Sequence, residues 1–247
     1  MSLKATSYWR REIQGSFTFD GLDSADYGLF IKGGGTFNAP RRKFTVVDIP
    51  GRNGGLTLDD GAYEDVTHTY PAFIARGFEK NVQEFRNLLA SKIGMLKLTD
   101  SFHPDEYYKA RYMAGLEVDV TGRAASGSFQ LEFMRDPRRF LWEGQFPQKI
   151  TPRGYLRNPT NQTARPLIHI SGSGTLTLND FSITVDSGLD EVWIDSEMME
   201  CYRGLQSVNS LVVFSGNDFP TLAPGITSVA CGDGIGFAEI TPNWWRL

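Results

Sequence analysis

The chain has few of the residues that most often carry chemistry in proteins. It contains only 2 cysteines and 3 histidines in 247 residues. Cys201 and Cys231 do not have zinc-finger spacing, and no two histidines have a metal-ligand spacing. We therefore expect no metal site and no cofactor. In a reducing environment the two thiols act as small apolar groups, and the sequence leaves open whether they form a disulfide.

Long apolar runs and a surplus of basic residues are also missing. No stretch reaches the roughly 18 apolar residues of a membrane span, and residues 1–14 lack the apolar centre of a secretory signal. Lys and Arg number 25 against 29 Asp and Glu, which gives a net charge of −4. Proteins that grip nucleic acid by its phosphates usually carry a basic face. We therefore expect no membrane partner and no tight hold on nucleic acid.

Familiar catalytic and phosphate-binding motifs are absent from the sequence as well. There is no Gly-x-Ser-x-Gly elbow, phosphate-binding loop or dinucleotide fingerprint. Carboxylates do gather beside Trp193 and Tyr202, an arrangement typical of glycosidases, and they are Asp195, Glu197 and Glu200. On β elements, however, Asp195 and Glu197 share one wet face, which needs no catalytic role. We interpret the protein as a non-enzyme.

The chain is rich in aromatic residues and glycine, with 17 Phe, 9 Tyr, 5 Trp and 26 Gly. Aromatic residues favour strands and interfaces, and glycines favour turns. Apolar and polar residues alternate most clearly over 116–121 and 129–134. This alternation predicts a hairpin with one dry and one wet face, joined by residues 122–127. Residues 44–49 predict another strand, which ends at Pro50 and Gly51.

One helix is predicted over residues 81–93. Asn81 is placed to cap its N-terminus, with Glu84 three residues later, and Gly94 is a natural stop. Apolar residues at helical spacing give the segment one face that packs on a core: these are Val82, Phe85, Leu88 and Leu89.

The second half of the chain predicts short strands without a helix. Its turns fall at intervals of roughly 8–12 residues, as in a β-sandwich. Residues 140–159 have no clean periodicity and are broken by prolines. We therefore expect a mainly β protein with two domains, a β domain with one α-helix and a hairpin over 1–145 and a β-sandwich over 146–247.

A series of turn and aromatic motifs runs along the chain in a fixed order. It includes Ile49-Pro50-Gly51-Arg52-Asn53-Gly54, Tyr70-Pro71, Phe219-Pro220-Thr221-Leu222-Ala223-Pro224-Gly225 and the closing Pro242-Asn243-Trp244-Trp245. Together these motifs resemble the distal tail protein (Dit) family of long-tailed bacteriophages and prophages. The resemblance extends over nearly the whole length.

The resemblance implies a structural building block of the virion tail tip, assembled in the cytoplasm of the bacterial host. In that family the N-terminal domain carries a projecting hairpin and forms a hexameric ring, and the C-terminal domain is a galectin-like β-sandwich. The ring connects the tail tube protein to the tail-tip (tail-associated) protein and to receptor-binding proteins. DNA only passes through its central channel.

The family's layout makes two regions candidates for contact between subunits, namely the Pro50–Gly54 loop and the hairpin predicted near residues 117–132. The candidate interface residues are Pro50, Gly51, Arg52, Asn53, Gly54, Glu117, Asp119, Gln130 and Glu132.

A second hypothesis is a carbohydrate-binding β-sandwich that aids adsorption to the host surface, and a third is a cell-wall hydrolase. Trp193, Trp244 and Trp245 are the candidates for stacking on sugar rings. The second half shows no galactose-binding set of His, Asn, Arg and Trp, and we expect the terminal Trp pair to be buried. His169 lies between two isoleucines and is expected at the surface or the edge of the core.

Overall fold

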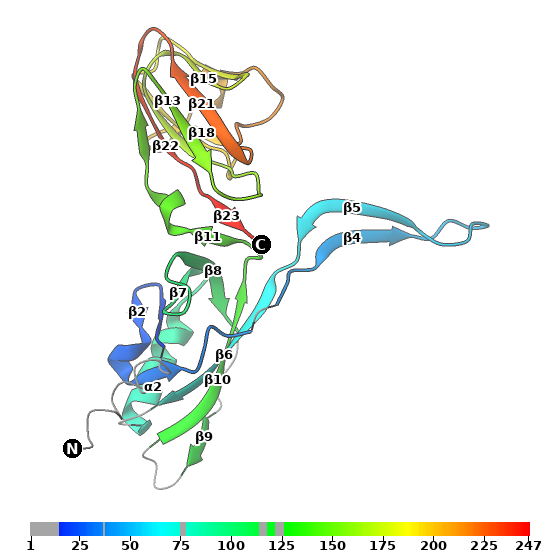
Figure 1. The fold of residues 1–247 in the computed structure, drawn as a ribbon, viewed down its shortest axis with the longest axis vertical. Coiled ribbons are helices and arrows are strands. Elements are labelled where there is room, and N and C mark those ends of the chain that lie inside the picture. Colours follow the sequence, from blue (N-terminus) through cyan, green and yellow to red (C-terminus); the bar gives the residue numbers. More distant parts are fainter. Residues whose placement is uncertain (1–14, 37, 75–77, 114–117, 122–125) are drawn as a thin grey trace. The chain divides into compact units, whose positions relative to one another are not determined.

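The computed structural model describes residues 15–36, 38–74, 78–113, 118–121 and 126–247 (Figure 1). The protein is mainly β, as predicted. Its contacts divide the chain into two compact units, residues 1–139 together with 247, and residues 140–246. The boundary predicted near residue 145 lies in η2 (Trp142–Gln145), a short 3-10 helix of the second unit.

The first unit is built on a twisted antiparallel sheet with the strand order β2-β1-β7-β8-β10-β6-β3, and β9 pairs with β10 (Figure 1). These strands are β1 (Phe17–Phe19), β2 (Leu22–Asp23), β3 (Leu29–Ile31), β6 (Val66–Ile74), β7 (Leu96–Asp100), β8 (Glu106–Tyr112), β9 (Val118–Thr121) and β10 (Ser126–Arg135). The short 3-10 helix η1 (Ser24–Tyr27) joins β2 to β3.

The dry face predicted for β10 is confirmed. Phe129, Leu131 and Phe133 are all buried, at 6%, 0% and 0% exposure. The predicted hairpin partner is also present, since Val118 of β9 lies opposite Phe129. The longest partner of β10 is nevertheless β6, which pairs with it along its whole length in a register that the local alternation did not indicate.

One α-helix, α2 (Phe78–Ser91), packs on this sheet. Val82, Phe85 and Leu89 are buried as predicted, because helical spacing places them on one face. The predicted N-cap is wrong, because Asn81 lies inside the helix and its side-chain amide donates to the Tyr27 carbonyl at 3.2 Å. The helix therefore begins earlier than its capping motif indicated.

The second unit is a β-sandwich whose two sheets enclose one hydrophobic core. The six-stranded sheet has the order β12-β22-β14-β17-β18-β19, with β12 (Gln148–Ile150), β14 (Leu167–Gly172), β17 (Glu191–Asp195), β18 (Glu200–Arg203), β19 (Gln206–Ser207) and β22 (Ile235–Thr241). The five-stranded sheet has the order β13-β21-β15-β16-β20, with β13 (Arg153–Asn158), β15 (Gly174–Leu178), β16 (Phe181–Val185), β20 (Val212–Phe214) and β21 (Gly225–Cys231). The remaining elements are β11 (Arg139–Leu141), which pairs with β23 (Trp245–Arg246), and the 3-10 helix η3 (Asn209–Leu211).

Period-two alternation explains why these short strands form a sandwich. Val192 and Ile194 of β17 are fully buried, while Trp193 between them faces the other side of the sheet. Both thiols are free, and burial raises the pKa of Cys201 to about 12. A thiol that stays protonated is unreactive, so Cys201 serves as a small apolar core residue.

Candidate assembly surface

A two-stranded arm projects from the first unit (Figure 1). It is formed by β4 (Arg42–Val47) and β5 (Leu56–Tyr63), which form a sheet of their own. The strands that precede and follow the arm, β3 and β6, are neighbours in the main sheet. The arm is therefore a long insertion between two strands that are adjacent in the sheet.

The tip of the arm is a tight turn. The Arg52 N–H donates to the Ile49 carbonyl at 3.1 Å, and Gly51 has a φ of +82°. Pro at the second position and Gly with positive φ at the third are the features of a type II turn. The Pro50–Gly54 loop, predicted as a subunit contact, thus forms the outer end of the arm.

Both faces of the arm carry apolar side chains that are open to solvent. Phe44 and Val46 on one face are 60% and 53% exposed. Leu58 on the other face is 49% exposed and lies beside Val47 and Leu56. A lone two-stranded hairpin is marginally stable in water, and clustered exposed apolar groups mark interaction surfaces. The arm is therefore suited to being covered by another protein surface.

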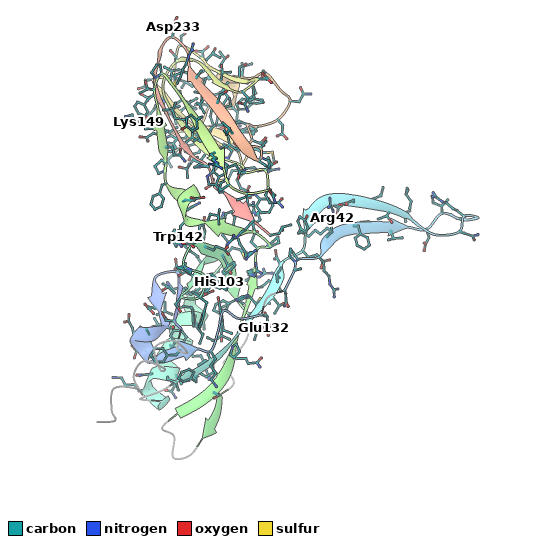
Figure 2. All side chains as sticks on the ribbon, viewed as in Figure 1. Arg42, His103, Glu132, Trp142, Lys149 and Asp233 are labelled. Carbon is teal, nitrogen blue, oxygen red and sulfur yellow. The ribbon has the colours of Figure 1, made fainter. Side chains whose placement is uncertain are left out.

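Polar contacts fix the root of the arm. Arg42 lies on β4 at this root (Figure 2). Its Nε lies 2.7 Å from Asp59 Oδ2, and its guanidinium lies over the Tyr63 ring, 5.8 Å from the centroid. The Gly61 N–H donates to Asp59 Oδ1 at 2.8 Å, and this bond and the Arg42 partner lower the pKa of Asp59. Gly61, with a φ of +68°, lies where the register of β4 and β5 shifts. The extra residues bend the arm at a defined place.

A pocket of about 540 Å³ lies where the two strands of the arm leave the main sheet. Residues 38–41 and 64–67 line it. The Asn38 amide donates to the Thr67 carbonyl at 3.1 Å, and the Thr36 hydroxyl accepts from the Thr69 N–H at 3.1 Å. These bonds attach the segment before the arm to β6, so the arm starts from a fixed base.

The second region predicted for subunit contact lies in the main sheet. Gln130 is exposed and Glu132 half-buried on the side of β10 that faces away from the core (Figure 2). Asp119 belongs to β9, opposite Ser128, and nothing is described of its side chain. Glu117 lies outside the described residues. The tip of the arm joins β4 and β5, which project away from the main sheet, so the structure does not bring the two regions together within one chain (Figure 1).

Titratable side chains gather at one end of the first unit's core. The buried Asp100 accepts from the Tyr70 hydroxyl at 2.8 Å and from the His103 N–H at 3.0 Å. The His103 ring Nδ1 also lies 3.0 Å from Asp100 Oδ1. The Arg135 guanidinium lies over the ring of Tyr108, 4.8 Å from its centroid. No local pattern in the sequence indicates this cluster.

His68 belongs to the same cluster and is only 2% exposed. Burial lowers its pKa to about 4, and the positive charge of Arg135 acts in the same direction. Neither ring nitrogen has a hydrogen-bond partner among the described residues. Gly35 lies so close that a Cβ there would be 2.5 Å from His68 Nε2. The histidine is enclosed by backbone, which favours a structural role over a catalytic one.

The carboxylates of the hydrolase hypothesis are engaged in turn geometry. Asp195 Oδ1 accepts from the N–H groups of Glu197 and Met198, each at 2.9 Å. The wet face predicted for Asp195 and Glu197 is wrong, because Glu197 lies in the turn after β17. Glu200 lies opposite Asp195 in the next strand. No set of three or more His, Cys, Asp or Glu is arranged to hold a metal in the described ranges.

The tryptophans of the sugar-binding hypothesis take part in packing. Trp244 is buried, and the Trp245 indole N–H donates to the Thr163 carbonyl at 3.1 Å while its ring stays half-buried. The Trp193 ring is stacked on His169 with centroids 4.2 Å apart and planes at 8°. The half-buried His169 lies on the outer face of the six-stranded sheet, opposite Trp193 and Glu239, which is the surface position that the sequence predicted. The structure therefore offers no open aromatic platform at these three positions.

Comparison with solved structures identifies the architecture. The chain matches the crystal structure of the Dit protein of phage SPP1 with a TM-score of 0.63 and 16% identity, over 92% of this chain and 97% of that one. The chain has a Dit-like fold. The resemblance predicted from the sequence is confirmed at that level, since an identity this low carries the fold alone.

Two baseplate structures of phage P2, in the activated conformation with Ca and with Sr, each match with a TM-score of 0.48 and 10% and 9% identity, over 92% of this chain and 96% of theirs. No protein-family model and no curated protein sequence matches the chain. The SPP1 protein is described as a paradigm of the hub of the adsorption apparatus in phages that infect Gram-positive bacteria.

The exposed apolar side chains of the arm were not predicted from the sequence. The sequence predicted the tip and the strand before it, but not β5 or the exposure of Phe44, Val46 and Leu58. The available signal was the presence of short apolar alternations on both sides of the Pro50–Gly54 loop. No helix in the part of the chain that the structure describes is long and apolar enough to cross a membrane.

Proposed function

We propose that the protein is a structural hub of a long-tailed phage or prophage tail tip, in which copies of the first unit close into a ring, hexameric as the family resemblance implies. The observation that carries this proposal is the arm, with apolar side chains exposed on both faces. The Dit-like fold over 92% of the chain supports it.

The arm suits a head-to-tail contact. In such a contact two different patches of the same chain fit each other, and the contacts close into a ring when the rotation between copies allows it. An arm that projects from one copy can lie on the next copy, and the arm of that copy can lie on the following one. Phe44 and Val46 on one side and Leu58 on the other then become buried between copies.

The ring connects the tail tube to the tail-tip protein and to receptor-binding proteins, and DNA passes through its channel. The net charge of −4 suits a channel that does not hold the phosphate backbone. The protein acts in the virion tail after assembly in the host cytoplasm. It is a structural protein and not an enzyme, and the Asp195 carboxylate, tied into its turn, is consistent with that role.

The test is electron microscopy of the purified protein, alone at rising concentration and mixed with its neighbouring tail proteins. We expect rings for the wild type and their loss in Leu58→Asp, because the new charge would have to be buried unpaired in the contact. The variant should fold normally, since Leu58 is 49% exposed in the single chain.

The matched control is Leu205→Asp, the same substitution at a fully exposed leucine of the second unit. It should form rings like the wild type. A protein that stays monomeric at every concentration and with its tail partners contradicts the proposal, as does normal ring formation by Leu58→Asp.

A further inference from the structure

The two outer faces of the second unit differ sharply in charge. The six-stranded sheet presents four carboxylates on its outer face, at Glu191, Asp195, Glu200 and Glu239. Among the described residues, the strands of the five-stranded sheet present no carboxylate on their outer face. The outward residues of this sheet, read from alternation and burial, include Arg153, Tyr155, Arg157 and Ile226, and the others are threonine, serine, valine or alanine.

The positive charge of that face is concentrated on its edge strand. Arg153, Tyr155 and Arg157 of β13 are all exposed, and Tyr155 reaches 71%. Leu156 between them is fully buried, which fixes the direction in which the other three point. In the part of the chain that the structure describes, neither arginine forms an ion pair with a carboxylate of the protein.

The edge itself is open for pairing. β13 is the last strand of its sheet and pairs with β21 on one side only. An edge strand presents unpaired N–H and C=O groups to whatever approaches. Ile226, opposite Arg157 on β21, is 67% exposed and extends the apolar surface inward. Tyr and Arg are the residues most enriched where binding energy is concentrated.

We propose that β13 binds an acidic, extended segment of another tail protein, which adds to the five-stranded sheet as a further strand. Residues directly opposite each other on neighbouring strands have Cβ atoms about 5 Å apart. The segment therefore places carboxylates opposite Arg153 and Arg157 and an apolar residue opposite Tyr155. Its pattern is acidic-x-apolar-x-acidic, with main-chain bonds along the strand.

This surface goes beyond the proposed ring, because it lies on the second unit and not on the arm. It also fits the charges present, since the opposite outer face would repel the same segment. The partner segment is thus selected by its negative charge as well as by its extended conformation.

The experiment is selection of random nine-residue peptides, displayed on messenger RNA, against the purified full-length protein. We expect the selected peptides to share the acidic-x-apolar-x-acidic pattern. Arg157→Glu should weaken their binding about five- to tenfold, because a repulsion replaces an exposed ion pair. Hydrogen exchange over residues 153–158 should slow when the peptide is bound, because their free edge becomes hydrogen-bonded.

Lys149→Glu is the matched control, since it reverses one exposed positive charge on the outer face of the six-stranded sheet (Figure 2). It should leave peptide binding unchanged, and both variants should form rings like the wild type. Selection of peptides without the pattern, equal binding to Arg157→Glu, or binding without slower exchange over 153–158 would each overturn the proposal. Inorganic polyphosphate binding as tightly as the peptides, again without slower exchange, would identify a general polyanion site instead.

Discussion

At the scale of single residues, the polar cluster of the first unit contains a buried positive charge on Arg135. Arg135 is 5% exposed, and two of its guanidinium nitrogens have no hydrogen-bond partner among the described residues. Burial accordingly lowers its pKa. Tyr108, over whose ring the guanidinium lies, favours the positive charge of Arg135, as do Tyr70 and Asp136, while Arg139 opposes it. A second positive charge beside Arg135 would therefore lower the stability of the folded protein.

His68 is that potential second cation, and it makes stability depend on pH. Its pKa is about 4 in the folded protein against 6.5 ordinarily. Arg135 and His103 oppose its protonation, while Asp100 favours it. Between these two values the unfolded chain binds a proton that the folded chain does not. The free energy of unfolding should therefore fall by about 3 kcal/mol as the pH drops from 6.5 to 4.

The measurement is urea unfolding at a series of pH values for the wild type and His68→Phe. Phenylalanine keeps an aromatic ring between Tyr70 and Tyr108 and cannot be protonated. The variant should lose this part of the pH dependence and keep its stability near neutral pH. Equal slopes for both proteins between pH 4 and 6.5 would show that His68 is not the responsible group.

At the scale of elements, the sequence predicted those whose pattern is local. The alternation in β10 predicted its buried face, and helical spacing predicted the buried face of α2. It did not predict β5, because Asp59, Asp60 and Gly61 look like a turn and both faces of that strand are exposed. The alternation of Leu56 and Leu58 is too short to distinguish a strand from a loop.

The polar cluster could not be predicted for a different reason. His68, Asp100 and Arg135 are far apart in the sequence and meet only because β6, β7 and β10 belong to one sheet. Their proximity depends on pairing between strands that no local pattern specifies. The same limit applies to Arg153 and Arg157 on edge strand β13. Among the described residues, no carboxylate lies beside them on that sheet because of the order in which its strands pair, which no local pattern specifies.

Replacing Leu131 in β10 by Asp tests the buried face of that element. Leu131 is fully buried, so the variant places an unpaired charge in the core and should lose about 3–5 kcal/mol of stability or fail to fold. Gln130→Asp, next to it on the exposed face, should unfold like the wild type. Circular dichroism with urea distinguishes them, and a normally stable Leu131→Asp variant would show that this face is not a core face.

At the scale of the whole molecule, the described residues form two hydrophobic cores that share no residue. One contains Phe85 and Leu131, and the other contains Ile194 and Trp244. A chain with two separate cores need not unfold in one step. We propose on this basis that the two units are two domains, close to the division predicted near residue 145.

Two unfolding transitions are therefore expected in urea, one for each unit. Ile194→Ala leaves a cavity in the second core and should lower the midpoint of one transition, at a cost of about 2–5 kcal/mol. Val82→Ala leaves a smaller cavity in the first core and should lower the midpoint of the other transition. Tryptophan fluorescence and far-UV circular dichroism follow the two events. If each substitution shifts one shared transition, the units unfold together and the division into domains is wrong.

The exposure of apolar side chains on both faces of the arm has a genetic consequence. In the ring that we propose, every copy gives one arm and receives one, so a copy without an arm still accepts its neighbour's arm but gives none. A single defective chain then leaves a gap in an otherwise sound ring, and a modest share of such chains spoils most particles. Loss of the arm should therefore be dominant over an intact gene expressed in the same cell, whereas mutations that unfold the subunit remove only themselves and should be recessive.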